Sequence, residues 1–259
     1  MAERVATCEA VTEPAVLVAA GKRRTIVYAG PSRPSTSTSN EDRRSQKLMP
    51  RFRATWRRWS VSPWLIRVTR ARVTLKWWLA GKPVPAPHVV KQRTVIRYQA
   101  RYRLRTFVET GTYTGEMVQA LSGHVDRVIS IEVAPWLHAQ AQARFAGQHH
   151  VRLLQGDSAT VLPVVLESLH ERALFWLDGH YMGEGSGRGT EETPVMAEMA
   201  ALLRHHVRGH VVLIDDARLF DGTDGYPSLE AFTTLVVRER PGTTVEVDGD
   251  IIRCRFDTA

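Results

Sequence analysis

Short apolar runs alternate with helical patterns from Thr106 almost to the end of the chain. Such alternation predicts parallel strands joined by helices. A crossover helix returns the chain to the end of the sheet where the previous strand began, so that the next strand runs in the same direction. The predicted strands are 106–110, 127–131, 151–155, 173–178 and 209–215, with helices near 115–122, 135–146, 159–170 and 194–206 between them.

The end of the chain departs from this alternation. A helix near 228–237 is followed by strands at 243–248 and 251–256, which flank Asp248-Gly249-Asp250, a hairpin turn signal. The predicted fold class is therefore α/β, a Rossmann-like seven-stranded sheet with helices on both faces. Five of its strands are parallel and the last two form a C-terminal antiparallel hairpin.

The first predicted strand ends in a glycine-containing turn, Glu109-Thr110-Gly111-Thr112-Tyr113-Thr114-Gly115. Glycine lets the backbone pass close to a ligand, and the helix that begins near Gly115 offers free N–H groups. This arrangement is typical of a nucleotide-type ligand. The Gly-x-x-x-Gly spacing is not the Gly-x-Gly-x-x-Gly of dinucleotide sites, so a dinucleotide is disfavoured.

Acidic residues follow the other predicted strands. Ligands of such sheets bind at the carboxyl ends of the strands. Glu132 after the second strand suits ribose hydroxyls, and Asp157 after the third can accept from an adenine amino group. Asp178 follows the fourth strand, and Asp215-Asp216 ends the fifth.

The glycine turn, Glu132 and the Gly156-Asp157 pair together resemble the class I S-adenosylmethionine-dependent methyltransferases over residues 89–256. The resemblance implies that S-adenosylmethionine is the cofactor. It places the methionine part at a turn comprising Glu109, Gly111, Thr112 and Gly115, the ribose at Glu132 and the adenine at Asp157.

The carboxylates of Asp178, Asp215 and Asp216 point to a subclass. Three close carboxylates repel one another unless a cation or protons intervene, and oxygen ligands suit Mg²⁺. The pattern is similar to the metal-dependent catechol and caffeoyl-coenzyme-A O-methyltransferases, although their Asp-Asn pair is Asp215-Asp216 here. The alternative is a solvated loop, with Asp216 as a helix cap.

The chain also resembles the sugar O-methyltransferases of macrolide pathways and a bacterial group that shares the strings FVETGTY, FWLDGH and LIDDARLF. These resemblances imply direct transfer of a methyl group to a hydroxyl of a small, sugar-like acceptor. The candidate catalytic residues are Asp178 and His180, with His180 as the base. His180 could equally be a metal ligand or a hydrogen-bonding residue.

Charge divides the chain. Residues 1–105 carry 23 Lys and Arg against 5 Asp and Glu, whereas residues 106–259 carry 12 against 22. We expect residues 1–48 to be disordered, with natural translation beginning at Met49. A basic, aromatic-rich extension and a proline linker would then occupy 49–88, and the methyltransferase domain 89–259.

Arginines interleave with tryptophans over residues 51–80. This composition suits contact with a membrane surface or with nucleic acid, or a helix that packs its Trp side on the domain. The helix predicted at 89–101 is a candidate lid over the ligand pocket.

Cysteine is rare, with only Cys8 and Cys254, so neither a disulfide framework nor a zinc site is expected. No run is long enough for a membrane span, and no signal peptide is recognised. We expect a cytoplasmic enzyme, with peripheral contact at the inner membrane surface left open and nucleic acid as the less favoured partner. The rival functions are a nucleic-acid methyltransferase and a non-catalytic membrane-docking protein. Nothing in the sequence indicates an oligomeric state.

Overall fold

The computed structural model describes residues 62–179 and 193–257. They belong to a compact unit that spans Trp59–Ala259, and a second unit, Met1–Arg58, lies outside the described ranges. The predictions for residues 1–48 and for a start at Met49 therefore also lie outside the described residues.

The described elements follow the predicted order closely. In chain order they are α2 (Pro63–Leu79), α3 (His88–Tyr102), β1 (Thr106–Thr110), α4 (Glu116–Leu121), β2 (Arg127–Glu132), α5 (Pro135–Phe145), β3 (Val151–Gln155), α6 (Ser158–Glu167), β4 (Leu174–Leu177), α7 (Val195–Arg204), β5 (Val211–Ile214), the 3₁₀ helix η1 (Ala217–Leu219), α8 (Leu229–Glu239), β6 (Thr244–Asp248) and β7 (Ile251–Arg255).

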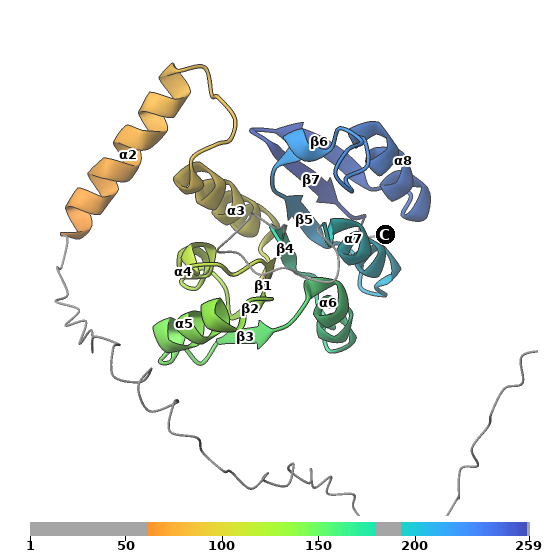
Figure 1. The fold of residues 1–259 in the computed structure, drawn as a ribbon, viewed down its shortest axis with the longest axis horizontal. Coiled ribbons are helices and arrows are strands. Elements are labelled where there is room, and N and C mark those ends of the chain that lie inside the picture. The colour runs from red at the N-terminus through yellow and green to blue at the C-terminus, as the bar shows by residue number, and fades with distance from the viewer. Residues whose placement is uncertain (1–61, 180–192, 258–259) are drawn as a thin grey trace, which may run out of the picture. The chain divides into compact units, whose positions relative to one another are not determined.

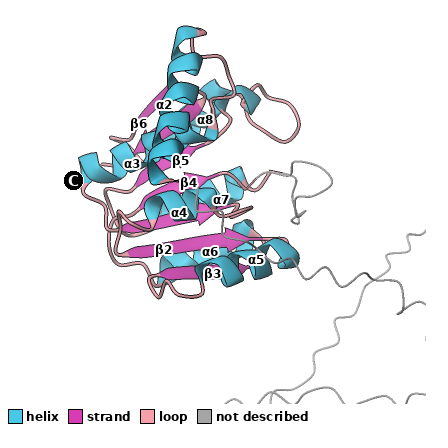
Figure 2. Cartoon of the chain, turned by 90° about the vertical axis from the view of Figure 1, so that its left-hand side faces the viewer, coloured by secondary structure: helices cyan, strands magenta, loops and turns pink. Residues whose placement is uncertain are grey.

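The strands form one seven-stranded sheet in the order β3-β2-β1-β4-β5-β7-β6. Figure 2 shows this sheet running from β3 at the bottom to β6 at the top. The first five strands pair in parallel, whereas β7 pairs antiparallel with both β5 and β6. The predicted fold class is confirmed.

Helices cover both faces of the sheet, because the side chains of each central strand alternate between two apolar layers. Phe107 belongs to the core under α3, α4 and α5, and the next residue, Val108, to the core under α6, α7 and α8. Figure 1 shows these two groups of helices on opposite sides of the strands.

The strand register brings the carboxyl ends of the parallel strands into line. Thr110 at the end of β1 pairs with both Ile131 and Leu177, and Leu177 pairs with Ile214. The residues that follow these positions, among them Asp178 and the aspartates after β5, therefore lie at one edge of the sheet.

The helix predicted at 89–101 forms as α3 and is an integral layer of the domain. Val95 and Tyr98 are buried in its interface with the sheet. Arg93 on the same helix donates to Thr74 Oγ1 of α2 at 2.8 Å. The proline connector between the two helices is not helical, as predicted. Among the helices of residues 62–179 and 193–257, none is sufficiently long and apolar to cross a membrane.

Candidate active site

Glu109 is buried in β1 and is linked by hydrogen bonds to the neighbouring strand. Ser130 Oγ donates to Glu109 Oε2 at 2.6 Å, and Thr112 Oγ1 lies 2.6 Å from the same Ser130 oxygen. Burial raises the pKa of Glu109 to about 8; the hydrogen bond from Ser130 opposes this rise and the charge of Glu132 adds to it. At neutral pH the side chain is mostly protonated, so a cation placed against it would expel the proton.

The two glycines of the turn are required by the packing of the chain itself. Gly111 has φ +84°, and a Cβ there would lie 2.4 Å from the carbonyl oxygen of Asp178. Gly115 has φ +75°, and a Cβ there would lie 2.7 Å from a ring carbon of Phe145. From the sequence we explained these glycines by close approach to a ligand. In the structure Gly111 also lets the end of β1 pack against the backbone that follows β4, and Gly115 lets the turn pack against Phe145 of α5.

Glu132 is held in one orientation beside this turn. Its Oε2 accepts from the Tyr113 N–H at 2.7 Å and its Oε1 from the Ala134 N–H at 2.9 Å. Each carboxylate oxygen has a second lone pair that can accept a further hydrogen bond. The predicted contact with a ribose remains a prediction.

Asp157 occupies the N-cap position of α6. Its side chain accepts from the Ala159 N–H at 3.0 Å, which satisfies one of the free N–H groups at the start of the helix. This bond orients the carboxylate at the same edge of the sheet as Glu132. The predicted adenine contact is likewise still a prediction.

The carboxylates of Asp178, Asp215 and Asp216 converge, as the strand ends led us to expect. One oxygen from each lies within 4.8 Å of the other two. Burial, then the charge of Asp215, raises the pKa of Asp178 well above its usual value. Burial, then the charge of Asp216, raises the pKa of Asp215. Burial and mutual repulsion therefore both disfavour full ionisation of these carboxyl groups.

Two basic side chains contact this cluster. Lys91 Nζ of α3 forms an ion pair with Asp215 Oδ2 and lies 3.3 Å from Asp216 Oδ1. Arg218 reaches Asp216 Oδ1 at 2.7 Å and also pairs with Asp250. Burial lowers the pKa of Lys91, but Asp215 and Asp216 outweigh that effect and the net change is upward.

Asp216 does not act as the side-chain cap that the sequence left open. It precedes η1 in a left-handed conformation with φ +56°, and its side chain makes no capping hydrogen bond. Its backbone N–H instead donates to Asp215 Oδ1 at 2.9 Å. In this arrangement Lys91 contacts both carboxylates, whereas Arg218 contacts that of Asp216.

A divalent ion matches this cluster in donor type but not in available space. Carboxylate oxygens are the ligands that Mg²⁺ prefers. However, the ammonium group of Lys91 already contacts oxygens of Asp215 and Asp216. An ion bound by these two carboxylates would require Lys91 to move away.

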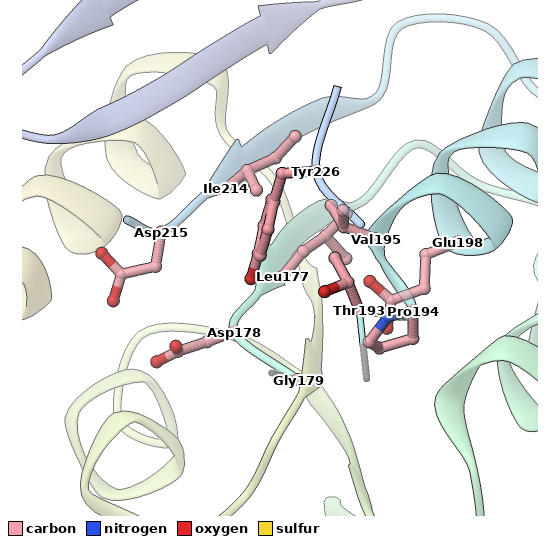
Figure 3. A pocket seen from close by; sticks show the side chains of 10 residues that line it. All are labelled: Leu177, Asp178, Gly179, Thr193, Pro194, Val195, Glu198, Ile214, Asp215 and Tyr226. Carbon is pink, nitrogen blue, oxygen red and sulfur yellow. The ribbon is translucent and has the colours of Figure 1, made fainter. Parts of the chain in front are cut away.

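A pocket opens beside Asp178, between the ends of β4 and β5 and the start of α7 (Figure 3). It is lined by Leu177, Asp178, Gly179, Thr193, Pro194, Val195, Glu198, Ile214, Asp215 and Tyr226. Figure 3 shows the Tyr226 hydroxyl directed toward the end of β4. Burial raises the pKa of Tyr226 to about 12, so its hydroxyl stays protonated and can donate a hydrogen bond.

Glu198 forms the buried side of this pocket. Burial raises its pKa to about 7, although the nearby hydroxyl groups of Ser158 and Thr110 oppose this rise. A Cβ on Gly179 would lie 3.4 Å from Glu198 Oε1 and equally close to both hydroxyl oxygens. Gly179 thus packs on a polar group of three side chains from β1, α6 and α7. His180, the predicted base, follows directly and lies outside the described residues.

Comparison with known proteins places this site in a recognised fold. No protein-family model matches the chain, and no curated protein matches its sequence. Among solved structures, the O-methyltransferase from Bacillus cereus in complex with SAH matches with a TM-score of 0.50 at 14% identity, covering 73% of this chain and 91% of that one. The O-methyltransferase TomG from Streptomyces achromogenes, involved in tomaymycin synthesis and bound to SAM, matches with a TM-score of 0.50 at 16% identity, covering 74% and 89%.

The chain has the class I methyltransferase fold. Within this methyltransferase fold, the predicted acidic residues all lie at the carboxyl edge of the sheet, as the sequence predicted. They are Glu109, Glu132, Asp157, Asp178, Asp215 and Asp216.

We did not predict from the sequence that Lys91, Ser130, Glu198 or Tyr226 would be site residues. A signal existed for Glu198, because Val195, Met199 and Leu202 are the apolar residues of the same helix face and a carboxyl among them must be buried. Ser130 similarly interrupts an apolar strand. No spacing indicated Lys91 or Tyr226, whose positions depend on how α3 and the segment after η1 pack.

Proposed function

We propose that this chain is an S-adenosylmethionine-dependent methyltransferase that methylates a hydroxyl group of a small, sugar-like acceptor. The observation that carries the proposal is the alignment of Glu109, Glu132 and Asp157 at one edge of a methyltransferase-fold sheet. The fold alone would not suffice, because one fold serves many functions. These three side chains suit the amino group, the ribose hydroxyls and the adenine of one ligand.

The cofactor, when bound, supplies a methyl group on a positively charged sulfur. Glu132 would accept from ribose hydroxyls with the lone pairs that Tyr113 and Ala134 leave open. The turn at Gly111, Thr112 and Gly115 would enclose the methionine part. Binding in a fixed orientation reduces the entropic cost of bringing the acceptor oxygen in line with the methyl carbon.

The acceptor would lie beside Asp178, in the pocket that Tyr226 and Thr193 line. The bond between the acceptor oxygen and the methyl carbon would form as the carbon–sulfur bond broke, and the hydroxyl proton would pass to a base. Asp178 supports this role because its raised pKa makes its carboxylate a stronger base than an ordinary aspartate. His180 remains the other predicted base.

Polar groups around the pocket support a hydroxylated acceptor. Tyr226 can donate a hydrogen bond, and the carboxylates of Asp178 and Asp215 can accept them from vicinal hydroxyls. The predicted divalent ion at Asp178, Asp215 and Asp216 is the least supported part, since Lys91 contacts two of these residues. No step above depends on it.

Calorimetry with S-adenosylmethionine and with its demethylated product tests the proposal. We expect both to bind the wild-type protein, and Glu132→Ala to weaken binding at least about tenfold, a loss of roughly 1.4 kcal/mol. Glu167→Gln on the exposed side of α6 is the matched control and should bind like wild type. Absence of binding by the folded wild-type protein would refute the proposal that this chain is a methyltransferase.

A second proposal concerns contact with an anionic membrane surface through residues 51–80. Within the described part of this segment, Trp64 is 67% exposed and Trp78 58% exposed, so these rings do not pack on the domain. Trp77 is partly buried and donates to the Pro83 carbonyl oxygen at 2.8 Å. The basic side chains of α2 are exposed as well: Arg67, Arg70, Arg72 and Lys76. Exposed tryptophans among cations suit lipid headgroups.

Vesicle flotation tests this contact, with a cytoplasmic location at the inner membrane surface as part of the proposal. The protein should float with vesicles that contain anionic lipid and not with purely zwitterionic ones. Trp64→Ala combined with Trp78→Ala should reduce flotation, whereas Val237→Ala, an exposed apolar residue of α8, should not. Flotation that is insensitive to the tryptophans, or binding to RNA instead, would contradict it.

A further inference from the structure

Lys91 carries a charge that is unusually deep in the domain. Its side chain is 12% exposed, and those of its partners Asp215 and Asp216 are 2% and 7% exposed. Removing an ammonium group from water costs several kcal/mol, so such a group persists in a protein interior only where opposite charges compensate it. The carboxylates at the end of β5 provide that compensation.

The cluster of Asp178, Asp215 and Asp216 in turn requires a positive charge. Three carboxylates within 4.8 Å of one another need positive charge nearby, and Arg218 is shared between Asp216 and Asp250. Lys91 is the cation that contacts Asp215 in the described part of the chain, and it comes from α3, a helix anchored by buried Val95 and Tyr98. The packing of α3 on the sheet therefore holds the Lys91 ammonium group at the strand ends.

An ammonium group and a divalent ion cannot occupy this position together. Mg²⁺ binds carboxylate oxygens at about 2.1 Å, closer than an ammonium nitrogen approaches, and the two cations would repel each other at that range. Binding an ion between Asp215 and Asp216 would also leave Lys91 buried without its partners.

We propose that Lys91 is the resident cation of the Asp178, Asp215 and Asp216 cluster and takes the place of a divalent ion there. This inference rests on the proposed function for its catalytic meaning: the ammonium group would position the carboxylates around the acceptor hydroxyl. Its central claim, that Lys91 excludes the ion, concerns the free protein and needs neither cofactor nor acceptor. Lys91 is thus a positioning residue of a metal-independent site.

Titration with Mn²⁺, followed by the electron paramagnetic resonance signal of the free ion, tests the claim on the full chain. Wild-type protein should show no saturable site below about millimolar Mn²⁺, and Lys91→Met should bind Mn²⁺ at least about tenfold more tightly than wild type. The double variant Lys91→Met, Asp215→Asn should lose that site. Arg93→Met, which removes an exposed cation from the same helix, should behave like wild type.

Two results would overturn the proposal. One is micromolar Mn²⁺ binding by the wild type that Asp215→Asn abolishes, because Lys91 would then not exclude the ion. The other is a folded Lys91→Met, or Lys91→Gln if the first variant does not fold, that binds no more Mn²⁺ than wild type. If neither variant folds, the wild type still tests the proposal: absence of a saturable Mn²⁺ site supports it, and micromolar binding that Asp215→Asn abolishes overturns it. Cofactor binding is measured separately, so failure of the proposed function leaves the Mn²⁺ result unchanged.

Discussion

His205 Nδ1 and His210 Nε2 lie 2.8 Å apart in the protein interior. The Ala173 N–H donates to His210 Nδ1 at 3.0 Å, so the proton of a neutral His210 is on Nε2 and is donated to His205. His205 Nε2 then donates to the Leu166 carbonyl oxygen at 2.9 Å. Every ring nitrogen is satisfied with both imidazoles neutral, and a further proton would remove an acceptor.

This pair predicts a loss of stability in mild acid. Burial, then the charges of His205 and Arg240, lowers the pKa of His210 to about 3, whereas an unfolded histidine titrates near 6.5. The unfolded state therefore gains protons first, and stability falls as the pH drops from 6.5 toward 3, by about 2 kcal/mol at pH 5. Urea unfolding of His210→Asn should show a smaller drop between pH 7 and pH 5. Exposed His124→Gln is the control, and parallel profiles for all three proteins would contradict the assignment.

The raised pKa of Glu198 predicts the opposite pH dependence of stability. Burial raises its pKa from 4.5 to about 7, so the folded state holds a proton that the unfolded state releases at lower pH. Its contribution is therefore lost as the pH rises from 4.5 through 7, by roughly 3 kcal/mol at most. Glu198→Gln mimics the neutral acid and should gain stability relative to wild type at pH 8 compared with pH 5. Exposed Glu167→Gln should show no such gain.

Glu109 predicts proton release on cofactor binding. It is mostly protonated at pH 7, and the amino group of the methionine part would bring a cation against it. Calorimetric titrations in buffers of different ionisation enthalpy should report release of about one proton per cofactor. Glu109→Gln should bind more weakly and release none. Equal proton release by both proteins would place the cofactor amino group elsewhere.

Gly111 predicts a large cost for adding one methyl group. A Cβ at this position would lie 2.4 Å from the Asp178 carbonyl oxygen, and the left-handed φ adds strain. We expect Gly111→Ala to lower the free energy of unfolding by about 3 kcal/mol or more. Gly123→Ala, where a Cβ meets nothing within 4 Å, should change it by less than about 0.5 kcal/mol. Similar denaturation midpoints for the two variants would contradict the packing argument.

Much of the fold was predictable because local patterns and the sheet agree. The predicted strands at 106–110 and 151–155 coincide with β1 and β3, since an apolar run bounded by turn residues has few other solutions. Helix ends were less certain: the helix expected at 159–170 ends at Glu167, and the one at 194–206 at Arg204. Their final turns depended on contacts that periodicity does not encode.

Some features of the candidate site were predictable from the sequence and others were not. Asp178 and Asp215 were predictable neighbours, because parallel strands in adjacent positions bring their carboxyl ends together. Glu198 was foreseeable as buried but not as a neighbour of Ser158 and Thr110. The partner of Gly111 proved to be the backbone of Asp178 directly after β4, which no local pattern in the glycine turn could indicate.

The sequence by itself determined the alternating strands, the glycine turn and the acidic residues at the strand ends, because these follow from local periodicity and conformational freedom. Only the tertiary structure decided which charges meet. Lys91 lies 124 positions before Asp215 in the chain, and their ion pair exists because α3 packs on the sheet with one face toward the strand ends. Electrostatic partners across such distances are set by packing, and here packing places a lysine where the sequence predicted a metal ion.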